Sequence, residues 1–293
     1  MSNNALPLVS ICIPTYNGAA YLAEALQSAL AQTYRPLEIV ISDDASSDAT
    51  LEVVASFKSS CDFPIKVLHH HPSGIGANWN HCVQHAQGDY IKFLFQDDVL
   101  LPDCINQLMD LIQRDTHIGM VYCKRDFILD VSNKQHLDFV NAYGDLHHNW
   151  GVVDVKEGVL PGTNYLKDPQ FLNAPKNKIG EPSAILLRKG CFEKVGYFDE
   201  QLHQDLDCAY WYRLMPYYKV GFKDAELVQF RLHNQQASVI NKAKTIPDRE
   251  LLYCMYYQKL FWYLHWKCQL KLLKLFHPLV KRLVSLKQWF HAK

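Results

Sequence analysis

The feature that most constrains the fold is an alternation of apolar runs and amphipathic segments over roughly the first 110 residues. The apolar runs have the length and composition of buried strands and occupy residues 7–14, 37–41, 66–68 and 90–95. The segments between them carry apolar residues at helical spacing and occupy residues 19–33, 49–57 and 78–86. Strands that alternate with helices pair in parallel through right-handed crossovers. The sequence therefore predicts an α/β fold with a Rossmann-like, mixed but mostly parallel sheet flanked by helices.

Two adjacent carboxylates, Asp97 and Asp98, follow the apolar run at 90–95. Ligands bind at the carboxyl ends of strands in an open α/β sheet, and paired carboxylates stay ionised most easily beside a cation. A divalent metal that carries a phosphate group would meet both conditions. The alternative is that Asp98 or Asp103 caps the helix that is expected to begin near Pro102.

A second acidic strand end, Asp43 and Asp44, follows the run at 37–41. Neighbouring parallel strands would bring both acidic ends to one edge of the sheet, where a single ligand could contact them. Aspartate accepts hydrogen bonds from a base N–H or from ribose hydroxyls. The alternative is that each aspartate closes a turn through its own side chain.

The composition indicates a globular protein, with 293 residues, 48% hydrophobic content, 20% charged content and no net charge. The nine cysteines include no CxxC pair, which is typical of reduced thiols in a reducing compartment. The N-terminus has neither the charged segment nor the long apolar segment of a secretory signal. We therefore expect a cytoplasmic protein.

The second half of the sequence lacks the regular alternation of strands and helices. Met120–Cys123 and 181–188 read as strands, and 127–138 as further strand or loop. Residues 145–177 are rich in Gly, Asn, His and Pro, which favours a mobile functional cover, with Trp150 and the adjacent histidines contacting either a ligand or the protein surface. Residues 203–214 form an aromatic-rich helix with Asp205 and Asp207 at its start, where the helix dipole favours ionised carboxylates.

Several motifs taken together, in order, resemble the family 2 glycosyltransferases with a GT-A fold. They are Pro-Thr-Tyr-Asn at 14–17, Gln-Thr-Tyr at 32–34, the segment 38–48, the segment 86–98 that ends in Asp97-Asp98, Trp-Tyr-Arg-Leu at 211–214 and Arg-Leu-His at 231–233. The resemblance covers roughly residues 7–240. It implies an inverting transferase that moves a sugar from a nucleoside-diphosphate sugar, expected to be a UDP-sugar, to an acceptor hydroxyl.

The resemblance also implies roles for individual residues. The residues expected to bind the nucleotide sugar are Pro14, Thr15, Tyr16, Asn17, Asp43, Asp44, Asn78, Asp97 and Arg231. Asp98 and His233 are expected to hold Mg²⁺ or Mn²⁺, and the acidic signature departs from the family pattern at Gln96, where an acid often stands. The catalytic base implied by the spacing to Arg213 is Asp207, with Asp205 as a rival.

The C-terminal segment is basic and aromatic. Residues 249–293 contain nine Lys or Arg and one acidic residue, Glu250. A single helix over 249–276 would place Lys259, Lys267, Lys271 and Lys274 within one third of its circumference. This pattern favours contact with an anionic membrane surface, and packing on the catalytic domain or another subunit is the alternative. No arginine-rich or RNA-binding pattern indicates nucleic acid.

These observations predict a catalytic domain at 1–240, with a nucleotide half of about 1–125 and an acceptor half of about 126–240, and a helical C-terminal region at 241–293. The expected role is bacterial surface polysaccharide or glycolipid assembly on a saccharide or lipid-linked acceptor. A nucleotidyltransferase and a non-catalytic sugar- or lipid-binding descendant of the fold are the alternatives. The early segment 14–18 lacks the Gly- and Lys-rich phosphate loop that a nucleotidyltransferase usually has.

Overall fold

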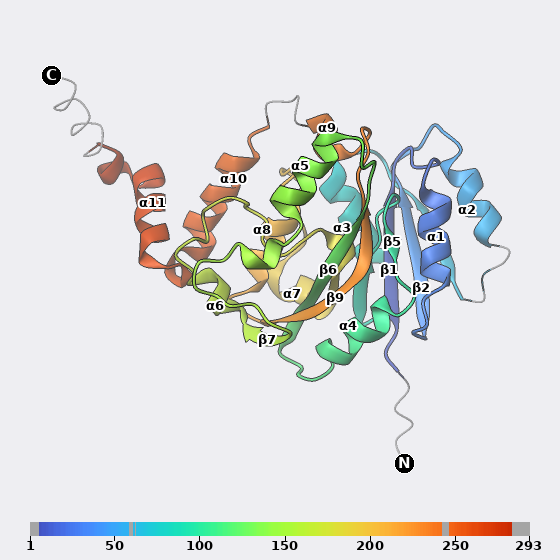
Figure 1. Cartoon of the computed structure of the whole chain (residues 1–293), viewed down its shortest axis with the longest axis horizontal. Coiled ribbons are helices and arrows are strands. Elements are labelled where there is room, and N and C mark those ends of the chain that lie inside the picture. The colour runs from blue at the N-terminus through green and yellow to red at the C-terminus, as the bar shows by residue number, and fades with distance from the viewer. Residues whose placement is uncertain (1–5, 59–60, 62, 242–245, 283–293) are drawn as a thin grey trace, which may run out of the picture.

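The computed structural model describes residues 6–58, 61, 63–241 and 246–282 (Figure 1). The strands are β1 Val9–Thr15, β2 Leu37–Asp43, β3 Ile65–His69, β4 Tyr90–Phe93, β5 Val99–Leu100, β6 Ile118–Ile128, β7 Gly158–Pro161, β8 Ile185–Arg188 and β9 Lys219–Arg231. The α-helices are α1 Leu22–Leu30, α2 Thr50–Lys58, α3 Ile75–His85, α4 Cys104–Ile112, α5 Lys134–Tyr143, α6 Gly162–Leu166, α7 Gly190–Val195, α8 Leu206–Leu214, α9 Ala237–Asn241, α10 Asp248–Met255 and α11 Trp266–Phe276. Short 3₁₀ or π turns occupy Leu146–His148, Pro182–Ala184, Tyr256–Leu260 and Phe261–Tyr263.

The strands form one nine-stranded sheet in the order β3-β2-β1-β4-β8-β6-β9-β5, with β7 paired to the free side of part of β9. Strands β1 to β4 run parallel to one another, as the alternation of strands and helices predicts. Strand β8 runs antiparallel to both β4 and β6, so β6 and β9 return to the direction of β4. The predicted mixed, mostly parallel sheet is confirmed.

Strands β1 and β2 lie inside the sheet, and every residue of both is buried. Their mostly apolar sequences suit this position, because helices cover both faces of a parallel sheet. The buried charge of Glu38 is compensated by donors: its Oε1 accepts hydrogen bonds from Ser10 Oγ and from the backbone N–H of Gln87, each at 2.5 Å. These bonds tie the turn before β4 to the start of β1 and β2.

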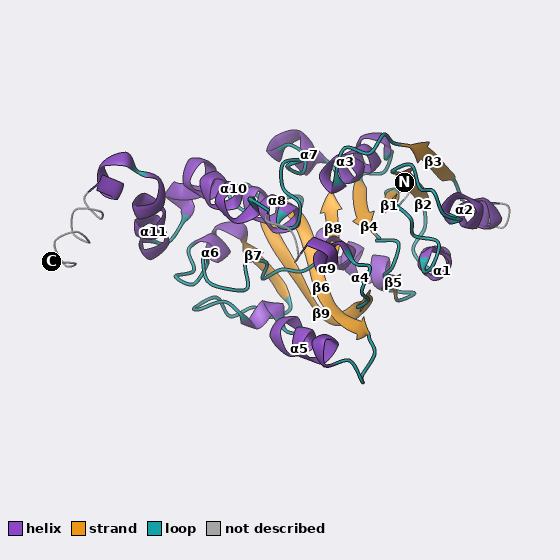
Figure 2. Cartoon of the chain, turned by 90° about the horizontal axis from the view of Figure 1, so that it is seen from above, coloured by secondary structure: helices purple, strands orange, loops and turns teal. Residues whose placement is uncertain are grey.

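Figure 2 shows the layers: α3 and α7 lie on one side of the sheet, and α1 and α5 on the other. The short helix α4 follows the acidic turn and begins after Asp103, whose side chain binds Thr33 and Asn106 instead of capping the helix. Asp98 is buried in the turn before β5 and is not a cap either. The capping alternative for Asp98 is therefore wrong, and this carboxylate is free for another role.

Two sequence expectations in the second half need correction. Strand β6 continues to Ile128, and the segment expected as strand or loop then contains helix α5, which starts where the Asn133 side chain accepts the N–H of Gln135 at 2.9 Å. No residue of α5 is buried, so the helix lies on the surface with Phe139 stacked on Phe230, and its start depends on the Asn133 cap. The irregular stretch at 145–177 contains a 3₁₀ turn, strand β7 and helix α6.

The C-terminal region is helical, as predicted, but it is not one helix. A π turn, a 3₁₀ turn and extended Leu264 separate α10 from α11, so the four lysines do not share one continuous helical face. Leu252, Tyr256 and Leu272 are buried in the same hydrophobic core as the strands. Residues 242–245 and 283–293 of the predicted C-terminal region lie outside the described residues.

Figure 1 places α11 at the end of the molecule farthest from α1 and α2. None of the helices in the described parts of the chain combines the length and the apolar character that crossing a bilayer requires.

Candidate active site

The ends of β1 and β2 meet at one edge of the sheet. Thr15 pairs with Asp43 in register, and Thr15 Oγ1 donates a 2.8 Å hydrogen bond to Asp43 Oδ1. The Thr15 carbonyl accepts the N–H of Asp44 at 2.9 Å and the side-chain amide of Asn78 at 3.3 Å. Four residues predicted to bind the nucleotide therefore lie in direct contact, and the side-chain oxygen of Asn78 is buried without a protein partner.

Asp43 also closes the loop that follows β2. Its two oxygens accept hydrogen bonds from the N–H (2.9 Å) and the hydroxyl (2.6 Å) of Ser46. Asn17, which has a positive φ of 47°, links this loop to the loop after β1, because its N–H donates to Ser46 Oγ and its side chain accepts the N–H of Ser47. The turn interpretation is confirmed for Asp43, and the two loops are held as one unit.

Asp44 has a different partner, because its Oδ1 pairs with Nδ1 of His70 at the end of β3. His70 packs against His81, with 4.8 Å between ring centroids, and His81 Nδ1 lies 2.8 Å from Ser42 Oγ. Burial lowers the pKa of His81, and the neighbouring rings of His85 and His70 lower it further. His70 was missed by sequence reasoning, although three adjacent histidines at 69–71 were a usable signal.

Asp97 and Asp98 lie where the turn after β4 meets the end of β9. The N–H of Arg231 donates to Asp98 Oδ1 at 3.2 Å, and its Nε donates to the Asp97 carbonyl at 2.9 Å. His233 Nε2 lies 2.9 Å from Asp97 Oδ2. The predicted Arg-x-His segment therefore contacts the predicted acidic pair, although 133 residues separate Arg231 from Asp98.

The carboxylate of Asp98 is strongly perturbed. Burial raises its pKa well above the usual value, and the charges of Asp97 and Glu181 raise it further, whereas the hydrogen bonds from Ser183 and Arg231 lower it. Its Oδ2 is buried and has no protein partner. A buried, unpartnered carboxylate oxygen is costly unless a cation or donor completes it. Asp98 Oδ2 is therefore a candidate metal ligand beside a second carboxylate.

Gln96 stands where the family pattern often has an acid, and it joins the acidic turn to the first loop. Its Oε1 accepts the N–H of Tyr16 at 2.9 Å, and its Nε2 donates to the Tyr16 carbonyl at 3.1 Å. The side chain of Tyr16 is 57% exposed, whereas Pro14 is buried within β1. An amide can make both bonds at once, which a carboxylate cannot do.

Asp207 lies in the first turn of α8. Its Oδ2 accepts the side-chain amide of Asn177 at 2.8 Å, and its Oδ1 accepts the N–H of Cys208 at 2.5 Å. Burial raises its pKa well above the usual value, and the charges of Asp205 and Glu181 raise it further, whereas these two hydrogen bonds lower it. Asp205 instead forms a 2.6 Å ion pair with Lys176.

Glu181 connects the two halves of the site. Its charge raises the pKa of both Asp98 and Asp207, so it lies within electrostatic reach of both. Arg125 Nε lies 2.6 Å from Glu181 Oε2 and balances this charge. Sequence reasoning missed both residues, because nothing local marks Arg125 on β6 as the partner of a residue 56 positions later.

The structure favours packing over sugar contact for two residues of the 145–177 segment. Trp150 is 7% exposed and contacts the rings of Tyr165 and Tyr212 edge-on. His147 is buried and stacks on Phe222, with 4.9 Å between ring centroids. Burial lowers the pKa of His147, and the nearby charges of His148 and Lys124 lower it further.

The fold is similar to those of solved glycosyltransferases. TarS of S. aureus, in complex with UDP-GlcNAc, matches with a TM-score of 0.61 at 17% identity, covering 86% of this chain and 67% of that chain. The mannosyltransferase PcManGT of Pyrobaculum calidifontis, in complex with GDP-Man and Mn²⁺, matches with a TM-score of 0.57 at 16% identity, covering 99% and 82%. The sheet order and the acidic strand ends thus define a GT-A glycosyltransferase fold.

The sequence itself gives the family. Residues 10–195 match the family model described as glycosyl transferase family 2, and the chain belongs to this family. An uncharacterized glycosyltransferase of Rickettsia typhi is 28% identical over 239 residues, which span 80% of this chain and 67% of that protein. The predicted family, fold and glycosyltransferase activity are confirmed.

Proposed function

We propose that the protein transfers a sugar from a nucleoside-diphosphate sugar to an acceptor hydroxyl with inversion at the anomeric carbon. The observation that carries the proposal is that one short segment contacts both carboxylates, because Asn177 donates to Asp207 Oδ2 at 2.8 Å and Ser183 hydrogen-bonds to Asp98. A candidate phosphate-side carboxylate and a candidate base therefore both lie against the segment 177–183. Direct displacement needs this pair of functions and no enzymic nucleophile.

The nucleoside end of the donor is assigned to the ends of β1 and β2. Asp44, held by His70, would accept a base N–H, and Asn78 has a buried side-chain oxygen free to accept another donor. Asp97, which His233 orients through a 2.9 Å contact, would accept hydrogen bonds from the ribose hydroxyls. We favour a UDP-sugar, because the TarS structures contain UDP and UDP-GlcNAc.

A divalent metal, Mg²⁺ or Mn²⁺, fits the residues at the diphosphate end. Asp98 would hold it through the unpartnered Oδ2, and His233, whose Nδ1 is also buried without a partner, is the second proposed ligand. Carboxylate oxygen and imidazole nitrogen suit Mn²⁺, and the mannosyltransferase neighbour contains this ion. When bound, the ion would neutralise the charge that develops on the departing diphosphate. Arg231 would add a cation at the same place.

Asp207 is the proposed base. It would take the proton from the acceptor hydroxyl while the oxygen of that hydroxyl bonds to the anomeric carbon and the bond from this carbon to the diphosphate breaks. Its raised pKa brings it closer to the operating pH, where a base is most effective. Asp205 is the weaker candidate, because Lys176 already neutralises it.

The acceptor and the cellular place are also proposals. We favour a saccharide or lipid-linked acceptor of a bacterial surface polymer, with the enzyme on the cytoplasmic side of a membrane and touching its surface through the C-terminal region. Exposed Trp262 and Trp266 and the surrounding lysines support this placement. The division into a catalytic domain at 1–240 and a C-terminal region at 241–293 stays a prediction.

The matched variants Asp207→Asn and Asp205→Asn test the reaction, because each removes one charge and keeps the shape of the side chain. We expect Asp207→Asn to lower turnover by two to four decades, which is about the contribution of a general base, and to leave donor binding nearly intact. Asp205→Asn should lower turnover by less than about tenfold. Normal turnover in Asp207→Asn would reject Asp207 as the base, whereas metal-dependent donor binding without any turnover in the unaltered protein, measured by thermal shift and product release, would favour the non-catalytic alternative.

A further inference from the structure

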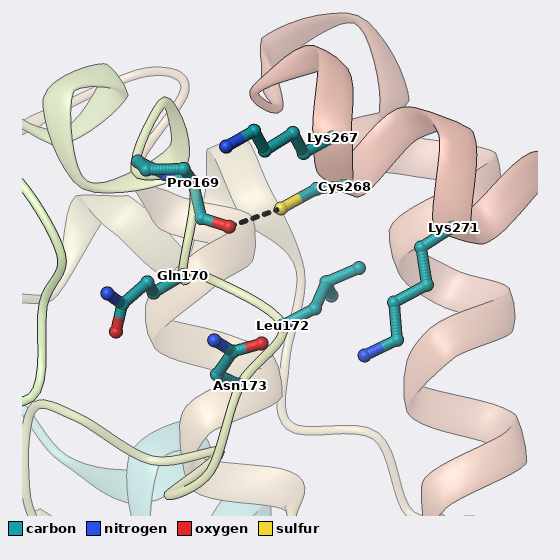
Figure 3. A pocket seen from close by; sticks show the side chains of 7 residues that line it. All are labelled: Pro169, Gln170, Leu172, Asn173, Lys267, Cys268 and Lys271. Carbon is teal, nitrogen blue, oxygen red and sulfur yellow. Dashed lines mark hydrogen bonds between the residues drawn. The ribbon is translucent and has the colours of Figure 1, made fainter.

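A cavity of about 390 Å³ lies between α11 and the loop that follows α6 (Figure 3). Lys267 and Lys271 project from α11 toward this loop, and the side-chain amide of Asn173 faces them from the other side. No carboxylate lines the cavity. Two cations and one amide without an acid form a lining that suits an anion.

The walls of this cavity are held in place. Cys268 and Leu272 of α11 are buried, and Cys268 Sγ lies 3.6 Å from the Pro169 carbonyl. On the facing side Asp168 is fully buried, and its carboxylate accepts the N–H groups of Gly151, Val152, Val153 and Gln170. These four donors compensate the charge of Asp168, so it does not need the lysines of the cavity.

Neither lysine of the cavity has a carboxylate partner among the described residues of the chain. Each has only a weak aromatic neighbour: Lys267 Nζ lies 5.8 Å from the ring centroid of Trp266, and Lys271 Nζ lies 5.9 Å from that of Tyr253. Both side chains are exposed. Their charges are therefore available to an external anion.

The surface beside the cavity is apolar and basic. Trp262 is 87% exposed, Trp266 58% and Leu270 47%. Helical geometry places Trp266 and Leu270 next to each other, with Lys274 and Lys267 following on the same exposed side of α11. Tryptophan and lysine in this arrangement are typical of a helix that lies in the headgroup layer of a membrane.

We propose that this cavity binds the phosphate of an anionic phospholipid headgroup while Trp262, Trp266 and Leu270 enter the interface. The proposal rests on the proposed membrane contact and is independent of the transfer reaction. It places the phosphate between Lys267 and Lys271, with the amide of Asn173 as a neutral donor. The same loop continues to Asn177, which donates to Asp207, so the cavity and the proposed base contact one loop.

The test measures binding of the full-length protein to vesicles of phosphatidylcholine with and without phosphatidylglycerol. Removing residues after Asp248 would also remove buried Leu252, Tyr256 and Leu272, so point variants are preferable. The pairs Lys267→Gln with Lys271→Gln and Lys259→Gln with Lys274→Gln remove the same charge from the same region, and only the first pair lines the cavity. Asn173→Ala removes the neutral donor without a change of charge.

We expect binding only to vesicles that contain phosphatidylglycerol. Each cation near such a surface increases vesicle affinity roughly fivefold. The double variant at Lys267 and Lys271 should therefore weaken binding by about thirtyfold or more, and by more than the double variant at Lys259 and Lys274 does. Asn173→Ala should weaken it by about threefold to tenfold. Equal losses for both lysine pairs together with an unchanged Asn173→Ala would overturn the headgroup site.

Two further outcomes are decisive. Absence of binding by the unaltered protein to anionic vesicles would overturn the whole proposal. Inorganic phosphate that raises the melting temperature through the same two lysines, without any vesicle binding, would assign the cavity to free phosphate and would equally reject the lipid. Transfer to a soluble acceptor is measured separately, so a failure of the transferase proposal does not affect this result.

Discussion

Asn177 is expected to set the pH dependence of the reaction through its hydrogen bond to Asp207. The amide donates to Asp207 Oδ2 at 2.8 Å and lowers the pKa of a carboxyl group whose pKa burial, Asp205 and Glu181 raise. Asn177→Asp removes this donor and places a second carboxylate in its position. It keeps Oδ1, which accepts the N–H groups of Ile179 and Gly180 at 3.0 Å each and so holds the loop.

The magnitude follows from the bond that is lost. A hydrogen bond to a charged group contributes about 1.5–3 kcal/mol, and about 1.4 kcal/mol is a factor of ten. The base must be ionised to accept a proton, so activity is lost as the pH falls through its pKa. A higher pKa moves this loss to higher pH. At a pH on the acidic limb, kcat/KM should therefore fall at least about tenfold, whereas the rate at the alkaline plateau should return to within a few-fold.

The assay is release of nucleoside diphosphate as a function of pH, with the donor chosen from a panel of nucleotide sugars by metal-dependent thermal shift. Asn173→Asp is the matched control, because it makes the same charge change on an exposed side chain of the same loop. Its profile should keep the original acidic limb. An unchanged limb in Asn177→Asp, or a loss of equal size at every pH, would refute the assignment of Asp207 as the base.

Three other predictions concern metal binding and stability. His233→Ala should weaken Mn²⁺ binding by about tenfold to a hundredfold, because it removes a proposed ligand and the group that orients Asp97, and the metal titration of the melting temperature checks this. Asp168→Ala should lower the free energy of unfolding by about 3 kcal/mol or more in urea, because four backbone N–H groups lose their buried acceptor. Gly88→Ala should lower the free energy of unfolding by about 1–3 kcal/mol in the same assay, because its Cβ would lie 2.7 Å from the Leu8 carbonyl oxygen. An unchanged unfolding curve for either variant would contradict the corresponding prediction.

The sequence by itself determined the nucleotide half of the protein. Strands β1, β2 and β4 are mostly apolar runs, and polar or acidic residues end them or follow them within a few positions, which is a local pattern. Parallel pairing then brings Thr15, Asp43 and Asp97 to one edge, because successive strands share a direction. Asp207 could also be placed at the start of a helix from the residues around it.

Only the tertiary structure decided the surroundings of these carboxylates. His70 on Asp44, Asn177 on Asp207 and the Arg125–Glu181 pair join residues at least 26 positions apart. Their pairing depends on how loops and the antiparallel strands close over the sheet, and no period of the sequence encodes that. The same holds for the C-terminal region, where turns at Tyr256–Leu260 and Phe261–Tyr263 break the expected single helix, and Tyr256 and Leu260 pack into the core. Local sequence patterns place the carboxylates at one edge of the sheet, whereas long-range contacts determine the pKa and the hydrogen-bond partners of each carboxylate.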